Sequence, residues 1–158
     1  MNLSDITTPA LAYLGDSVLE VCVRTYLVTE RGLSTSAHLN RASLDFVRAS
    51  AQSEAMGRME PCLTEEESAV YRRGRNMGHG NVPKSATVAE YRRATGMEVL
   101  FGYLSLTGQS LRLDYLFRVG YGLPCDPTCG PTCDPTCGPT TGPTADAPTP
   151  LQSGESQT

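Results

Sequence analysis

The stretch LAYLGDSVLEVCVRTYL, residues 11–27, is the most strongly patterned part of the chain and predicts a helix packed on two sides. One helical stripe of apolar side chains comprises Leu11, Leu14, Val18, Val21 and Cys22. A second stripe comprises Ala12, Leu19, Val23 and Leu27. Because both stripes are apolar, we expect neighbouring helices to cover both faces of this segment.

One acidic residue interrupts this pattern. Asp16 falls on the second stripe, with Glu20 one turn later. A carboxylate directed toward a core has to be paired, hydrogen-bonded or bound to a metal, since burying it alone costs several kcal/mol. Asp16 could instead cap a helix that starts at Ser17. Thr8 and Pro9 favour an earlier start, because Thr is a good N-cap and Pro a good first helical residue, and Asp16 would then be internal.

Composition predicts one domain followed by an acidic tail. The 158 residues carry a formal charge of −4, but all 13 Lys and Arg lie in residues 1–124, which also hold 13 of the 17 acids. The chain has no long apolar run for a membrane span and no basic flank followed by an apolar run for a secretory signal. Cys22 and Cys62 suggest no disulfide framework. We therefore expect a cytoplasmic protein without membrane attachment.

Four further helices are predicted from capping residues followed by helical apolar periods. They cover residues 35–57, 64–76, 87–106 and 110–121. The second and third of these open on Thr-x-x-Glu capping boxes, at Thr64 and Thr87, and Ser110 is the expected cap of the last. No segment alternates convincingly as a strand, so the predicted fold class is all-α.

The helix predicted over residues 87–106 carries a second unusual carboxylate. Glu98 interrupts a strongly apolar segment, as Asp16 does in the first helix. Gly96 and Gly102 in the same segment lower helix propensity by about 1 kcal/mol each. Their presence predicts the close approach of another helix, either within one chain or across a dimer contact.

A basic, glycine-rich region lies between these helices, over residues 72–93. Six Lys and Arg stand here against the single acid Glu90, and Gly74, Gly78, Gly80 and Pro83 mark a loop. Such a loop can approach a phosphate backbone, with Arg and Lys holding the phosphates. The alternative is a solvated loop whose bases pair with surface acids.

The last part of the chain, residues 125–158, has a different composition. It begins CDPTCGPTCDPTCGPT, a repeat in which proline at every fourth position forbids a helix and nothing can build a core. We interpret it as a disordered tail. The alternative is a zinc or soft-metal site formed by Cys125, Cys129, Cys133 and Cys137, although paired CxxC spacing is absent.

Three motifs in one order resemble a known family. LAYLGDSVLE, then RRGRN, then PKSATVAEYRRATGMEVLFGYL, together cover much of residues 9–121 and are similar to Mini-ribonuclease III. This small branch of the ribonuclease III superfamily consists of the catalytic domain without a double-stranded-RNA-binding domain. The resemblance implies an all-helical, homodimeric, magnesium-dependent endonuclease that cuts double-stranded RNA and matures the ends of large-subunit ribosomal RNA precursors.

The resemblance also implies roles for particular residues. Asp16 and Glu98 match the metal-binding catalytic positions of the superfamily. The loop implicated in RNA contact corresponds to Arg72, Arg73, Arg75, Asn76 and Lys84. Full-length ribonuclease III has further acids where this chain has Ala12 and Thr95, a reduction that the small branch shares. The number of protein ligands to Mg²⁺ is therefore left open, as is a contribution from Glu20.

Two other functions compete with this prediction. The first is a non-catalytic RNA-binding protein on the same helical scaffold, which would keep the basic loop without a working metal pair. The second is a helical dimerisation module whose unusual acids merely pair with Arg24 or Arg93. The presence of both Asp16 and Glu98 favours the nuclease.

Overall fold

The computed structural model describes residues 5–78 and 84–125, and every regular element in these ranges is helical. The elements are α1 (Thr8–Thr29), α2 (Ser36–Val47), α3 (Ala49–Met59), the short 3₁₀ helix η2 (Glu60–Cys62), α4 (Glu65–Arg75), α5 (Val88–Leu106) and α6 (Ser110–Tyr121). The predicted all-α class is confirmed. The division into a catalytic domain, 1–124, and a tail, 125–158, stays a prediction from composition, since residues 126–158 lie outside the described ranges.

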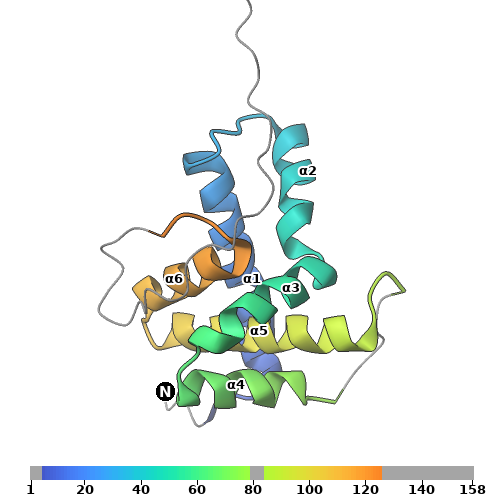
Figure 1. Ribbon diagram of the computed structural model, residues 1–158, viewed down its shortest axis with the longest axis vertical. Helices are drawn as coiled ribbons and strands as arrows, with labels where there is room; N and C mark the ends of the chain where they lie inside the picture. Colours follow the sequence, from blue (N-terminus) through green and yellow to red (C-terminus); the bar gives the residue numbers. More distant parts are fainter. Residues whose placement is uncertain (1–4, 79–83, 126–158) are drawn as a thin grey trace, which may run out of the picture.

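Helix α5 is the element on which most of the others pack, and Figure 1 shows it running across the lower part of the molecule. It packs most extensively against α1, then against α4 and α3, while α6 packs mainly on α3 and α2 on α1. Apart from the half-buried Glu98, every residue from 94 to 104 is buried. A helix that is apolar on all sides is stable only when neighbours surround it. The side of α5 on which Glu98 lies is thus the one place where this buried stretch opens toward solvent.

The predicted helix starts are confirmed at both capping boxes. Thr64 Oγ1 accepts a hydrogen bond from the Glu67 amide at 3.2 Å, and the Thr64 amide donates to Glu67 Oε2 at 2.8 Å. Thr87 and Glu90 repeat this arrangement at the start of α5. The start of α1 is one residue earlier than predicted, with Thr7 as its N-cap.

The start of α6 differs from the prediction, because Gln109 and not Ser110 is the N-cap. No side chain caps this end of the helix.

The single helix predicted over residues 35–57 is wrong, because the structure divides it into α2 and α3. Arg48 has φ −68° and ψ 144°, an extended conformation that ends α2. The Gln52 side-chain amide donates to the Val47 carbonyl at 3.0 Å, which satisfies one of the acceptors that the end of α2 exposes. The bend turns α3 toward α5, where Ala55, Met56 and Met59 are fully buried.

The expectation that both faces of α1 are covered, with Asp16 directed toward the core, is also corrected. Its buried residues are Leu11, Ala12, Gly15, Leu19, Val23 and Leu27. Asp16 is exposed, and Val21 of the other stripe is 64% exposed. Each residue of an α-helix is rotated by about 100° from the one before it, so the buried face passes through Gly15 and leaves Asp16 at its edge. Asp16 is nevertheless internal to the helix, which excludes a capping role.

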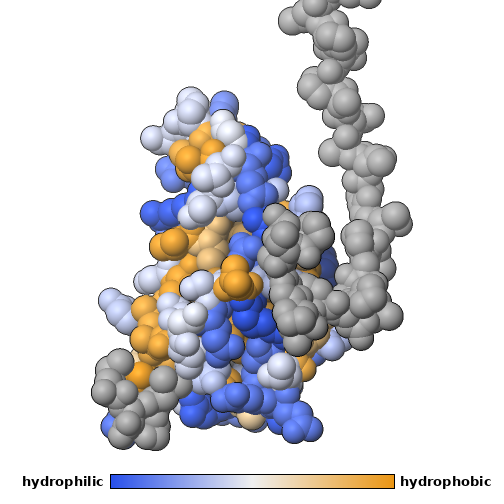
Figure 2. All heavy atoms as spheres, turned by 90° about the vertical axis from the view of Figure 1, so that its left-hand side faces the viewer, coloured by the Kyte–Doolittle hydropathy of each residue, from blue (hydrophilic) through white to orange (hydrophobic). Residues whose placement is uncertain are grey.

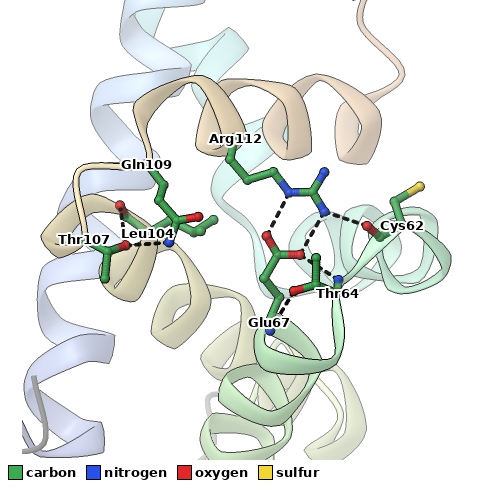
Figure 3. A network of polar contacts seen from close by, with 7 residues as sticks. All are labelled: Cys62, Thr64, Glu67, Leu104, Thr107, Gln109 and Arg112. Atoms are coloured by element: carbon green, nitrogen blue, oxygen red, sulfur yellow. Dashed lines mark hydrogen bonds and ion pairs between the residues drawn. The ribbon is translucent and has the colours of Figure 1, made fainter. Parts of the chain in front are cut away.

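A largely buried ion pair joins α4 to α6 (Figure 3). Arg112 donates to both carboxylate oxygens of Glu67 at 2.8 Å and to the Cys62 carbonyl at 2.6 Å. Burial alone would raise the pKa of Glu67, but hydrogen bonds from Arg112 and Thr64 outweigh it and hold that pKa below its usual value. The same carboxylate therefore caps α4 and fixes α6.

Candidate active site

The crossing of α1 and α5 brings Asp16 and Glu98 to one place. Gly15 lies directly against the backbone of Glu98, so close that a Cβ atom on Gly15 would overlap the Glu98 carbonyl group. Asp16, the next residue, is exposed, and Glu98 is half-buried. Two carboxylates that are far apart in sequence are thereby neighbours at the edge of the core.

The electrostatics of Glu98 reflect this position. Burial, and in second place the negative charge of Asp16, raise the pKa of Glu98 to about 7. Desolvation and a nearby like charge both disfavour the ionised form of a carboxyl group. A cation held between the two groups would remove the repulsion and favour ionisation of Glu98.

Neither base proposed as a simple ion-pair partner neutralises these acids. Arg24 forms its ion pair with Glu20, one turn earlier on α1. Arg93 pairs with Glu60 of η2 at 3.4 Å. The ion pairs assumed for the dimerisation-module alternative are therefore contradicted, and Glu20 is engaged by Arg24.

The oxygen donors of this pair fit a hard divalent cation. Among the residues that the structure describes, no three His, Cys, Asp or Glu side chains gather into a possible metal site. Asp16 and Glu98 would thus contribute two carboxylates, while water and substrate phosphate oxygens would complete the shell, an arrangement that Mg²⁺ accepts. Ala12 and Thr95, where the resemblance implies further acids in full-length ribonuclease III, are buried and offer no further carboxylate.

The predicted RNA-binding residues lie at the end of α4 and before α5. Arg72, Arg73 and Arg75 belong to the last turn of α4, Asn76 is its C-cap and Lys84 follows the undescribed residues 79–83. All are exposed except Arg75, which is half-buried with its guanidinium 5.7 Å from the centre of the Tyr71 ring.

The predicted loop begins later than expected. Gly74 is not a loop residue, because it is buried inside α4 against Val99 and Gly96. Gly80 and Pro83 lie outside the described residues.

The close helix contacts at glycine residues were predicted only in part. The close approach predicted from Gly96 and Gly102 is confirmed, but its partners are Tyr71 of α4 and Leu11 of α1 in the same chain. These faces are therefore not available as the dimer contact for which they were candidates. The contribution of Gly15 was missed, although a glycine inside a strongly apolar helix is the same signal that drew attention to Gly102.

Comparison with known proteins shows the family of the chain. The family model described as "Ribonuclease III domain" matches residues 9–109. The chain belongs to the ribonuclease III domain family. Its matched segment contains both Asp16 and Glu98.

Individual relatives show which members of the family the chain resembles. The chain is similar to Mini-ribonuclease 3 of Symbiobacterium thermophilum, with 51% identity over 65% of this chain and 78% of the relative. It is 35% identical to Mini-ribonuclease 3 of Clostridium tetani, over 75% and 78% of the two chains. Among solved structures, protein FN1578 of Fusobacterium nucleatum matches with a TM-score of 0.66 and 27% identity, over 73% of this chain and 91% of that one. The resemblance to Mini-ribonuclease III is confirmed.

Proposed function

We propose that this ribonuclease III family member is an endoribonuclease that cleaves double-stranded RNA, using a divalent metal ion held by Asp16 and Glu98. The meeting of these two acids at the α1–α5 crossing carries the proposal. The family match and the Mini-ribonuclease 3 relatives support the enzyme class. Mg²⁺ is the ion that the resemblance implies, and carboxylate oxygens are its preferred ligands.

The two carboxylates have complementary roles in this mechanism. Exposed Asp16 meets solvent and substrate, while half-buried Glu98 is held by the central helix. A bound Mg²⁺ would supply a water of lowered pKa and would stabilise charge on the reacting phosphate. The two acids together provide the negative charge that holds the cation against an anionic backbone, and Glu98 has to be ionised to do so.

RNA contact is assigned to Arg72, Arg73, Arg75, Asn76 and Lys84. Four of these five residues are exposed, and their side chains suit phosphate oxygens as donors. Double-stranded RNA presents its shape and 2′-hydroxyl groups more readily than its base edges, so we expect recognition of the duplex more than of a sequence.

We propose a homodimer, because α1 has an exposed apolar side. Tyr13, Val21 and Val28 are 83%, 64% and 53% exposed, and helical spacing places them on one side of α1. Figure 2, seen from the side on which α6 and the end of α1 lie in Figure 1, shows hydrophobic groups among the hydrophilic ones. Two copies joined here would supply two sites, one for each strand of the duplex.

The resemblance to Mini-ribonuclease III further suggests that the substrate is a large-subunit ribosomal RNA precursor and that the protein works in the cytoplasm. Within residues 5–78 and 84–125, no helix is both long and apolar enough to cross a membrane.

The deciding experiment is cleavage of a long duplex RNA with Mg²⁺ by the wild type and by Asp16→Asn and Glu98→Gln. We expect the wild type to cut and both variants to lose activity by at least about 100-fold while remaining folded. Glu54→Gln, the same chemical change at an exposed acid of α3, should cut normally. A wild type that binds duplex RNA but cuts with no divalent ion would instead support the non-catalytic RNA-binding alternative.

A further inference from the structure

Two glycines let the backbones of α1 and α5 touch at the candidate active site. A Cβ atom on Gly15 would overlap the Glu98 carbonyl and lie 2.8 Å from the Gly102 nitrogen. A Cβ atom on Gly102 would overlap the Leu11 carbonyl oxygen and lie 3.2 Å from the Gly15 nitrogen. The contact is therefore reciprocal, and any side chain at either position would push the helices apart.

This contact lies next to both acids. Asp16 directly follows Gly15 in α1, and Glu98 lies one helical turn before Gly102 in α5. The separation of the two helix backbones thus sets the separation of the two carboxylates. A functional constellation tolerates errors of only about 0.5 Å, which is less than the displacement that an added methyl group at this contact requires.

A second face of α5 is also held closely by glycines. A Cβ atom on Gly74 would lie 2.7 Å from Val99 Cβ, and one on Gly96 would lie 2.6 Å from ring atoms of Tyr71. Helix α4 therefore also packs closely on α5, although its nearest contacts are to the side chains of Val99 and Tyr71 and are less tight than the backbone contact with α1. Because α3 and α4 also pack on α5, they hold it in place against a side chain introduced at Gly15 or Gly102.

We infer that Gly15 and Gly102 are positioning residues, which fix the spacing of the Asp16 and Glu98 carboxylates for a divalent cation. The inference rests on the metal site proposed above. It assigns to these glycines a function beyond packing: they determine cation affinity through the distance between two helices.

The test measures binding of Mn²⁺ alone, without RNA, from the loss of the free-ion electron paramagnetic resonance signal. Gly15→Ala and Gly102→Ala are compared with the wild type in sucrose, which favours the folded state. We expect both variants, per folded molecule, to bind Mn²⁺ roughly 10- to 100-fold more weakly, as is typical when the support of metal ligands is disturbed. If both stay unfolded, Ala12→Val, which enlarges a side chain on the same buried face of α1, takes their place and should also weaken Mn²⁺ binding.

Leu11→Ala is the matched control. Leu11 is 2% exposed at the same interface, so its truncation removes packing without adding bulk between the backbones. It should lower the melting temperature and leave Mn²⁺ affinity unchanged. Glycine variants that bind as tightly as the wild type, or a Leu11→Ala variant that loses affinity to the same extent, would overturn the positioning role. A wild type that binds no Mn²⁺, or binds it as well after Asp16→Asn, would overturn the metal site itself.

Discussion

Asp16 and Glu98 place two like charges close together, and Glu98 is partly withdrawn from water. Both effects raise the pKa of Glu98 to about 7, with burial the larger cause. In the unfolded chain this carboxyl would ionise at its ordinary value of 4.5. The site therefore reduces the stability of the metal-free protein at neutral pH, as is common where function needs an arrangement that folding alone would not favour.

The pH dependence of stability follows from this shift. Between pH 4.5 and about 7 the folded chain retains a proton on Glu98 that the unfolded chain has lost, so the stability of the wild type falls as pH rises through that window. Glu98→Gln removes this titration. We expect its melting temperature without divalent ions to match that of the wild type at low pH and to exceed it by several degrees at pH 8.

Glu54→Gln controls for the loss of one negative charge, since Glu54 is exposed on α3. If the difference in melting temperature between Glu98→Gln and the wild type stays constant from pH 4 to pH 8, the raised pKa of Glu98 is contradicted. Added Mg²⁺ should stabilise the wild type more than Glu98→Gln, because a ligand stabilises only the state that binds it.

At the scale of helices, sequence predicted starts better than breaks or orientations. The helix starts at Thr64 and Thr87 could be predicted because a capping box is a local motif whose two residues are three positions apart. The break at Arg48 depends on how α2 and α3 pack against different helices, and local propensity does not contain that information. The same holds for α1, where the apolar pattern placed Asp16 toward the core, whereas in the structure Gly15 faces α5 and Asp16 is exposed.

At the candidate site, too, the sequence predicted the residues but not their arrangement in space. Asp16 and Glu98 could be chosen from sequence because a carboxylate in an apolar helix demands an explanation. Their proximity could not be derived from either helix alone, since it arises from the crossing of α1 and α5. The backbone contact at Gly15 and Gly102 depends on that crossing as well.

The ion pair between Glu67 and Arg112 is the connection between elements that we expect to matter most for stability. The side chains of the pair are 5% and 15% exposed. Glu67→Gln keeps an acceptor for the capping box but leaves Arg112 without its counter-charge, which should cost about 3 kcal/mol in free energy of unfolding. Urea denaturation measures this loss.

Glu20→Gln provides the comparison, because the Glu20–Arg24 pair is exposed and within one helix. Its loss should cost less than about 1 kcal/mol. If the two substitutions lower the free energy of unfolding equally, the ion pair between α4 and α6 contributes no more to stability than an exposed pair does.

For the whole molecule, charge predicts how strongly RNA is bound. Residues 1–124 carry equal numbers of acids and bases, so affinity for a polyanion has to come from local clusters such as Arg72 and Arg73. Replacing both with Gln should weaken duplex binding at every sequence and reduce the slope of log affinity against log salt by about 1 for each lost phosphate contact. Filter binding without divalent ions, over a range of KCl, gives this slope. Arg31→Gln, at an exposed base after α1, is the control, and an equal change there would argue against a specific basic surface.

The exposed apolar side of α1 predicts that the protein forms a dimer. An apolar side that carries an 83%-exposed Tyr13 and a 64%-exposed Val21 is costly for a monomer but suits the dry centre of a symmetric contact. Val21→Glu places a charge in that contact in both copies, so we expect sedimentation to change from dimer to monomer. Duplex cleavage should fall at the same time, since each strand loses its own site. Leu44→Glu, at a 42%-exposed position of α2, should leave both unchanged. A wild type that sediments as a monomer at concentrations where it still cuts both strands would exclude the dimer and require one site to act on the two strands in turn.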